Sequence, residues 1–251
     1  MIPLFAPILG FGYDAVTIRE ELLRDCWHLL TPSGAIKERL KYYNPSFSVC
    51  TDEELEENSY QIFDDKQNRT WVAGKYNAWF TANLTYIPDN ADTTWQNVTA
   101  KDGKIEILRE KYKEPWQWRP ELLDKNKLPY LKNYLTRFPF EYLQCVRLIV
   151  MEPPAIGMIH QDSNRGNMYY QNGFAGFNLN VFDGGGILRF QNYNTNKVYD
   201  VDNSCKIFHF DDSTLHGVTK TSTQRIQFRI YGKLCKNYNY LNMLDLEKAI
   251  W

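Results

Sequence analysis

Three residues in the second half of the chain have the types and the spacing of a metal site. His160 and Asp162 are two positions apart, so on an extended strand both would point to the same face. A second imidazole, from the distal His216, would complete a set of two histidines and one carboxylate. This set is typical of non-haem Fe(II) sites, which keep one side of the metal open for a co-substrate and O2. We therefore predict that these three residues bind Fe(II).

Short strands on both sides of these residues would hold the ligands in place. The predicted strands alternate with turn sequences and cover residues 146–151, 156–159, 176–182, 187–190, 205–210 and 225–230. The glycine-rich stretch 183–186 predicts a tight turn, after which residues 187–190 would return as the partner strand. Ligands at the ends of two short strands are typical of a small antiparallel barrel or jelly roll.

The motifs around these residues resemble those of a known family. The order His160-x-Asp162, Gly185-Gly186-x-Leu188-x-Phe190, a distal His216 and then Arg225 is similar to the pattern of the Fe(II)/2-oxoglutarate-dependent dioxygenases. The stretch from Phe210 to Val218, with Arg225 nine residues after the histidine, is most similar to the aspartyl/asparaginyl β-hydroxylase and proline hydroxylase-like branch. The resemblance covers residues 146–232. Aspartyl β-hydroxylase lacks the carboxylate ligand that Asp162 provides here, so the resemblance favours the substrate class of that branch without fixing it.

The resemblance implies a fold, a reaction and cofactors. The implied fold is α+β: a double-stranded β-helix, or cupin-like jelly-roll barrel, with N-terminal helices packed on its outside. Residues 1–251 would form a single domain in which residues 1–140 wrap the catalytic core 141–235. The implied reaction is hydroxylation of an unactivated C–H bond in a polar substrate, such as a free amino acid or a peptidyl side chain. Fe(II) would be the metal, and 2-oxoglutarate and O2 would be converted to succinate and CO2. Demethylation, desaturation and ring formation use the same ligands and stay open.

Arg225 is predicted to bind the C5 carboxylate of 2-oxoglutarate. Its guanidinium offers a planar, bidentate partner on the strand that follows the distal histidine. A surface salt bridge is the alternative. Gln227 lies on the same face, and Asn178 and Asn180 are expected on the inner face of their own strand, so these three amides are further candidates for co-substrate contacts. Ordinary strand-end polarity is the alternative for the two asparagines.

The substrate is less well defined by the sequence. Arg229 shares the strand face of Arg225 and is a second co-substrate contact or an anchor for a substrate anion, and Arg147, Arg165 and Tyr169 are further candidates. A nucleobase substrate stays open because the chain has 17 tyrosines and 7 tryptophans, although a net charge of −1 provides no general basic field for nucleic acid. A non-catalytic, cupin-like binding module is the alternative from another functional class. It would bind no Fe(II) and would not turn over 2-oxoglutarate.

Composition places the chain among globular proteins. Its 251 residues are 43% hydrophobic, enough for one large domain with a full core. The five cysteines are widely separated and show no C-x-x-C pair, which favours reduced thiols and argues against zinc. The apolar start 1–9 lacks basic residues and contains two prolines, so neither a signal peptide nor a membrane span is expected, and we predict a cytoplasmic protein. The oligomeric state cannot be predicted from the sequence.

The N-terminal half predicts elements that would surround the barrel. A helix is expected over residues 14–30, with Thr17 and Glu20 as a capping box, and further helices over 35–43, from 51 and within 113–134. Residues 78–87 predict a strand that extends the main sheet, and 88–104 a surface loop or lid. His28 and His209 are interpreted as structural histidines.

Overall fold

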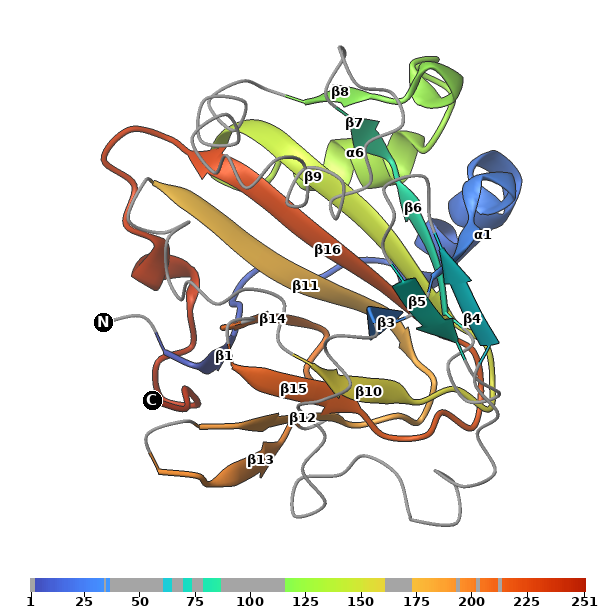
Figure 1. Cartoon of the computed structure of the whole chain (residues 1–251). Helices are drawn as coiled ribbons and strands as arrows, with labels where there is room; N and C mark the ends of the chain where they lie inside the picture. The colour runs from blue at the N-terminus through green and yellow to red at the C-terminus, as the bar shows by residue number, and fades with distance from the viewer. Residues whose placement is uncertain are drawn as a thin grey trace.

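Two antiparallel sheets dominate the computed structural model (Figure 1). The structure describes residues 3–33, 35–36, 61–64, 70–73, 79–86, 116–160, 173–192, 195–201, 204–211 and 214–251, and only the backbone of residues 31–36, 61–64, 70–73, 86 and 158–160 within these ranges. The order in the larger sheet is β1-β14-β11-β16-β9-β6-β2. Its strands are β1 (Phe5–Pro7), β2 (Thr31–Ser33), β6 (Trp79–Asn83), β9 (Phe140–Met151), β11 (Phe174–Asp183), β14 (Ile207–Phe210) and β16 (Arg225–Leu234).

The smaller sheet has the order β10-β15-β12-β13. Its strands are β10 (Gly157–His160), β12 (Leu188–Gln191), β13 (Val198–Asp200) and β15 (Leu215–Val218). Two short additional sheets consist of β3 (Ala35–Ile36), β4 (Gln61–Asp64) and β5 (Thr70–Ala73), and of β7 (Thr85–Tyr86) and β8 (Gln117–Trp118).

From β9 onwards the chain passes repeatedly between the two main sheets. The strands β9, β11, β14 and β16 belong to the larger sheet, and β10, β12, β13 and β15 belong to the smaller one. Antiparallel strands that are shared in this way between two sheets are consistent with a jelly-roll-like fold. The predicted antiparallel, jelly-roll-like arrangement of the strands is therefore confirmed at this level.

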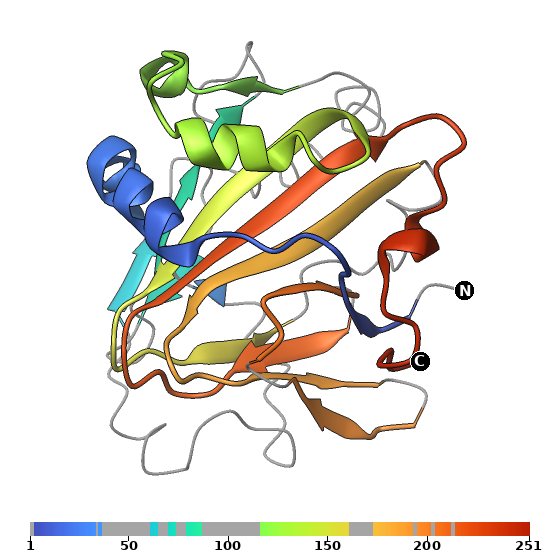
Figure 2. The ribbon, with the colours of Figure 1, turned by 180° about the vertical axis from the view of Figure 1, so that it is seen from behind.

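Two helices cover the face of the larger sheet that is turned away from the smaller sheet (Figure 2). They are α1 (Ala15–Asp25) and α6 (Pro129–Leu135), and the described 3₁₀ turns are η1 (Trp27–Leu29), η2 (Pro120–Leu122) and η3 (Tyr240–Met243). Ile18 and Leu22 of α1 pack in one core with Leu148, Phe228 and other apolar residues of the sheet. A second core between the sheets includes Met151, Phe208, Leu188, Phe190 and Val218. Leu148 of β9 and Phe228 of β16 belong to the core beneath the helices, so the residues that alternate with them along each strand face the smaller sheet.

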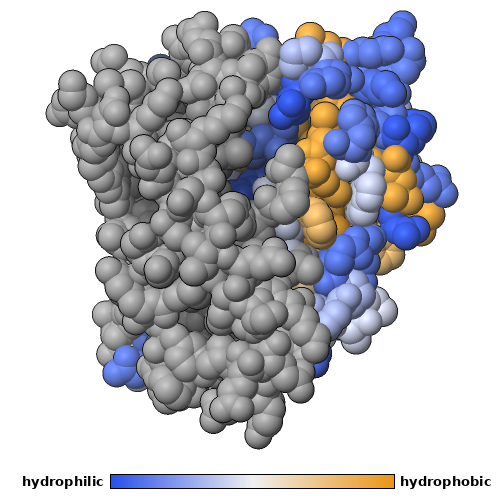
Figure 3. Space-filling model, turned by 45° about the vertical axis from the view of Figure 1, so that its right-hand side comes forward, coloured by the Kyte–Doolittle hydropathy of each residue, from blue (hydrophilic) through white to orange (hydrophobic). Residues whose placement is uncertain are grey.

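The surface on the side that carries α1 and α6 is mainly hydrophilic, with apolar side chains between the polar ones (Figure 3). The large apolar residues exposed on the described surface include Val16 and Leu23 of α1, and also Leu123. No helix in the described part of the chain is long and apolar enough to cross a membrane.

Helix α1 begins three residues earlier than the predicted capping box. The Asp14 side chain is the N-cap and accepts hydrogen bonds from the backbone N–H groups of Val16 and Thr17. The helix ends at Asp25, and the predicted continuation to residue 30 is the separate turn η1. The strand predicted over 78–87 is present as β6, which extends the larger sheet beside β9, and as β7.

Two predicted elements are wrong. Residues 187–190 were expected to pair back on the preceding strand, yet β12 pairs with β13 and β15 in the other sheet. Gly184 and Gly185 have φ angles of 65° and 73°, and the chain leaves the larger sheet there instead of reversing within it. Ala35–Ile36, expected to start a helix, is strand β3, because its backbone pairs with β5. The remainder of that predicted helix, the one from 51 and the loop 88–104 lie outside the described residues.

Candidate metal and co-substrate site

His216 lies on β15 with its side chain buried between the two sheets. The side chain is 4% exposed, and Nδ1 lies 2.9 Å from the Thr214 carbonyl oxygen. A carbonyl oxygen only accepts hydrogen bonds, so this contact assigns the proton to Nδ1. The lone pair is therefore on Nε2, the nitrogen that a metal would use, and the hydrogen bond fixes the orientation of the ring.

The register of the smaller sheet brings the two predicted histidine ligands together. His160 on β10 is directly opposite His216 on β15. Opposite residues in an antiparallel pair lie on the same face, with their Cβ atoms about 5 Å apart. Phe190 of β12 is opposite His216 on the other side and belongs to the core between the sheets. The face that carries both histidine positions is therefore turned towards the larger sheet.

The third predicted ligand, Asp162, lies outside the described residues, as do Arg165 and Tyr169. Within the part of the chain that the structure describes, no three His, Cys, Asp or Glu side chains are grouped as a metal site. His216, the predicted ligand whose side chain is described, nevertheless fits Fe(II), because imidazole is one of its usual ligands and the ring is already held in the required tautomer.

Arg225 lies at the start of β16 and points between the sheets. It is 2% exposed, so the surface salt bridge considered above is wrong. Nη1 donates to the carbonyl oxygens of Asp183 (3.2 Å) and Gly186 (2.8 Å). Nη2 donates to Asn180 Oδ1 (3.3 Å) and Gln227 Oε1 (3.2 Å). Burial lowers the pKa of Arg225 to about 10, so the group is still a cation at pH 7.

The three predicted amides form one network with Arg225. Gln227 Nε2 donates to Asn178 Oδ1 at 2.8 Å, and Asn180 and Gln227 both accept from the guanidinium. Asn178, Asn180 and Gln227 are all buried. The alternative of strand-end polarity for the two asparagines is therefore wrong, because both lie inside the strand β11 and are shielded from solvent. Arg225 Nε is buried and has no acceptor among the described residues.

Arg229 and Arg147 lie further along the same face of the larger sheet. Arg229 of β16 is directly opposite Arg147 of β9. The Arg229 guanidinium lies over the Phe210 ring, 5.4 Å from its centroid, and that ring contacts the His216 imidazole with centroids 4.9 Å apart. No site role was predicted for Phe210, the first residue of the motif 210–218, or for Asn83, which is opposite Arg147. The polar Asn83 in the apolar stretch 79–84 was the available signal.

The other two histidines have no part in this arrangement. His209 is fully buried, with Nε2 3.1 Å from the Pro3 carbonyl oxygen and its ring edge-on to Tyr240. Burial lowers the pKa of His209 to about 4. His28 is exposed in η1. The interpretation of His209 as a buried structural residue is confirmed.

Comparison with known proteins gives results for solved structures only. No family model matches the chain, and no curated protein matches it. It is similar to a prolyl-4-hydroxylase of Pseudomonas putida, with 13% identity and a TM-score of 0.41 over 93% of this chain and 94% of the other. A 2OG-Fe(II) oxygenase family oxidoreductase of Burkholderia pseudomallei has 9% identity and a TM-score of 0.35 over 88% and 91%. A Trichoplax adhaerens prolyl hydroxylase, solved with a hypoxia inducible factor peptide, has 10% identity and a TM-score of 0.34 over 86% and 87%.

Proposed function

We propose that this protein is an Fe(II)/2-oxoglutarate-dependent oxygenase that hydroxylates an unactivated C–H bond of a polar substrate. The observation that carries the proposal is the position of His160 opposite His216, whose Nδ1 is fixed by the Thr214 carbonyl. The face that bears this pair is turned towards the strand β16 that carries Arg225. A metal at His216 and the His160 position would then share the space between the sheets with the buried Arg225 cation, which suits a co-substrate with one chelating end and one carboxylate end.

His160, Asp162 and His216 would hold the metal. When bound, Fe(II) would supply the activation of O2, while 2-oxoglutarate is oxidised to succinate and CO2. The Thr214 carbonyl keeps the His216 ring in its ligand tautomer. Phe210 and Phe190 pack close to His216 and limit the access of water.

Arg225 would hold the C5 carboxylate of 2-oxoglutarate. Its present acceptors, besides two carbonyl groups, are the amide oxygens of Asn180 and Gln227, which a carboxylate can replace. The exchange of a neutral acceptor for an anion strengthens the hydrogen bonds to a buried guanidinium. Gln227 would still be held by the hydrogen bond that its Nε2 donates to Asn178 Oδ1.

We propose that the chain forms a single domain in which residues 1–140 surround the core 141–235. We further propose a free amino acid or a peptidyl side chain as the substrate. The solved prolyl hydroxylase with a bound peptide is similar to this chain in fold arrangement only, so the reaction on this substrate class rests on the motif and on the polar inner face.

Calorimetric titration of the metal-free protein with Fe(II) under anaerobic conditions tests the proposal. The wild type should bind about one equivalent, and His216→Ala should weaken binding at least about tenfold. His28→Ala is the matched control, because this histidine is exposed and distant in the sequence from the predicted ligands. The rate of succinate formation from 2-oxoglutarate should likewise be lower in His216→Ala than in the wild type and in His28→Ala. Equal Fe(II) binding by wild type and His216→Ala would contradict the assignment and favour the non-catalytic binding module.

A further inference from the structure

Four polar residues form a single row across the inner face of the larger sheet. Arg229 of β16 is opposite Arg147 of β9. Asn178 of β11 is opposite Arg229, and Asn83 of β6 is opposite Arg147. The order across the four neighbouring strands is therefore Asn178, Arg229, Arg147 and Asn83, and we refer to these residues as the arginine row.

Two guanidinium groups at directly opposite positions can donate to one and the same oxyanion. Their Cβ atoms are about 5 Å apart in an antiparallel pair, so both side chains can reach a single ligand on that face. Both charges also act on the buried Cys145, the next inner-face residue of β9: burial raises the pKa of its thiol to about 12, and the two arginines act in the opposite direction. An oxyanion held between Arg147 and Arg229 would accept charge-assisted hydrogen bonds from both guanidinium groups.

The arginine row is accessible and close to the predicted metal ligands. Arg147 and Arg229 are partly exposed, whereas Asn83, Asn178 and Cys145 around them are buried. The Phe210 ring contacts both groups. The Arg229 guanidinium lies 5.4 Å from the centroid of this ring, and the centroid of the His216 imidazole lies 4.9 Å from it. A molecule bound to the two arginines would therefore lie close to the predicted metal ligand His216.

This position differs from the predicted 2-oxoglutarate carboxylate site. Arg225 lies four residues before Arg229 on β16, a distance of about 13 Å along a strand. Its two Nη atoms already have protein acceptors, and it is fully buried. The two cationic positions can therefore serve two different oxyanions at the same time.

We propose that Arg147 and Arg229, flanked by Asn83 and Asn178, bind a carboxylate of the substrate that is oxidised. The substrate class is then an anionic small molecule or peptide whose carboxylate lies close to the reacting carbon. The assignment to an oxidised substrate rests on the proposed function. The existence of an oxyanion site does not, because two planar guanidinium groups and two amides bind a carboxylate without a metal.

Sulfate is a suitable probe for the oxyanion site in the metal-free protein. The increase in Tm from sulfate relative to chloride at equal ionic strength should be larger in the wild type than in Arg147→Gln or Arg229→Gln by at least about 2 °C. Arg119→Gln removes a surface arginine that is paired with Glu121, and it should keep the wild-type increment. Arg147 and Arg229 are changed separately, so one folded variant of the two is enough to test the oxyanion site. Equal increments in all four proteins would overturn the oxyanion site.

Titration with Fe(II) and 2-oxoglutarate then separates the substrate from the co-substrate. Arg147→Gln and Arg229→Gln should leave the Kd for 2-oxoglutarate within about threefold of the wild-type value, whereas Arg225→Ala should raise it at least about tenfold. A tenfold rise in the Kd for 2-oxoglutarate in Arg147→Gln or Arg229→Gln would assign the arginine row to 2-oxoglutarate and overturn the substrate assignment. Absence of 2-oxoglutarate binding by the wild type would refute the proposed function but not the sulfate result.

Discussion

At the residue scale, the Arg225 guanidinium has an unusual environment for a buried cation. Its four described hydrogen-bond acceptors are neutral, two backbone carbonyls and two side-chain amides. Burial of a charge among neutral groups is costly, which is why its pKa is lowered to about 10. A co-substrate carboxylate would relieve this cost, so binding of 2-oxoglutarate and stability of the folded protein should be coupled.

Gln227→Glu tests that coupling directly. The new carboxylate would lie where Gln227 Oε1 accepts from Arg225 Nη2 at 3.2 Å, and it would neutralise the guanidinium from within the protein. We expect the Kd for 2-oxoglutarate to rise at least about tenfold, because the anion then competes with an internal carboxylate. Gln227→Met, which has a similar size and no charge, is the control. Calorimetry measures both affinities, and an unchanged Kd in Gln227→Glu would show that Arg225 does not hold the co-substrate.

His209 should make the stability of the protein depend on pH. Its pKa is lowered by burial from 6.5 to about 4, so the folded state binds a proton more weakly than the unfolded state. The contribution is fully present above about pH 6.5 and is lost as the pH falls towards 4, by about 3 kcal/mol. Urea denaturation at pH 7 and pH 4.5 measures the loss. His209→Gln should show a smaller difference between the two pH values, and an equal difference would contradict the assignment.

At the scale of the elements, the turn after β11 packs closely against the residues that lead into β16. Gly184 has a φ of 65°, and a Cβ atom there would lie 2.7 Å from both the Thr223 carbonyl oxygen and Arg225 Cβ. Gly184→Ala should therefore lower the free energy of unfolding by more than about 2 kcal/mol and displace Arg225. Gly12→Ala is the control, because nothing lies within 4 Å of its Cβ position. Equal denaturation midpoints for the two variants would contradict this.

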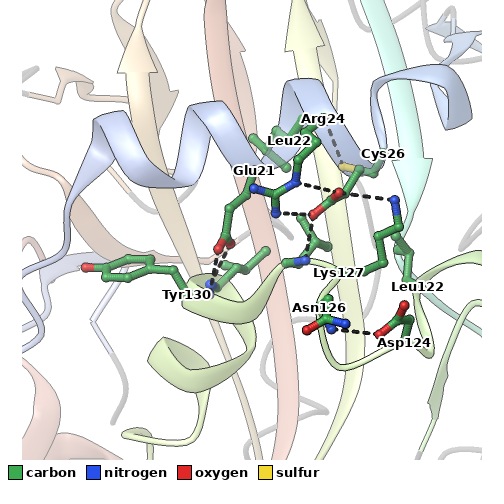
Figure 4. A network of polar contacts seen from close by, with 12 residues as sticks. Glu21, Leu22, Arg24, Cys26, Leu122, Asp124, Asn126, Lys127 and Tyr130 are labelled. Carbon is green, nitrogen blue, oxygen red and sulfur yellow. Dashed lines mark hydrogen bonds and ion pairs between the residues drawn. The ribbon is translucent and has the colours of Figure 1, made fainter.

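Two carboxylates of α1 anchor the short helix α6 (Figure 4). Glu21 accepts from the N–H groups of Tyr130 (2.7 Å) and Leu131 (3.0 Å), where α6 has no side-chain cap of its own. Asp25 accepts from the Leu128 N–H at 2.8 Å and from the Arg24 side chain at 2.6 and 2.8 Å. The two helices are thus fixed to each other above the larger sheet by buried, fully bonded anions.

Asp25→Asn should destabilise this helical layer. The Arg24 guanidinium is the largest cause that lowers the pKa of Asp25, to about 2, from the usual 3.8. The resulting stabilisation of about 2 kcal/mol is present above about pH 4 and is lost as the pH falls towards 2. Urea denaturation at pH 7 should show a loss of this size in Asp25→Asn and little change in Glu20→Gln, an exposed residue of the same helix. Equal stability of both variants would contradict the role of Asp25.

Local sequence patterns predicted some elements well and others poorly. The alternation in β16 was recognised because Ile226, Phe228 and Ile230 bury one face, while the polar residues between them share the other. The partner of β12 was missed because the glycine turn suggests a hairpin, whereas the actual pairing is with β15, which is distant in sequence. The N-cap of α1 was misplaced because Asp14 and Thr17 both suit that position, and only the backbone decides between them.

At the scale of the whole molecule, the two faces of the larger sheet differ in polarity. The helical side of the larger sheet buries an apolar core, whereas its inner face carries Arg225, Gln227 and the arginine row. Such a polar interior costs folding free energy, and proteins retain it mainly at functional sites. The sequence motif indicated which residues belong to this space, but their pairing across strands depends on the register of both sheets. That register brings Arg147 opposite Arg229, which no local pattern predicts.

The central claim is that the space between the sheets binds Fe(II) and 2-oxoglutarate together. Anaerobic titration of the metal-free protein with both, monitored by visible absorbance, measures this through the charge-transfer band of a metal-bound 2-oxo acid. We predict a band that saturates at about one equivalent of Fe(II), is absent in His216→Ala and is weakened in Arg225→Ala. A folded wild-type protein that binds no Fe(II) and shows no band would contradict the proposed function.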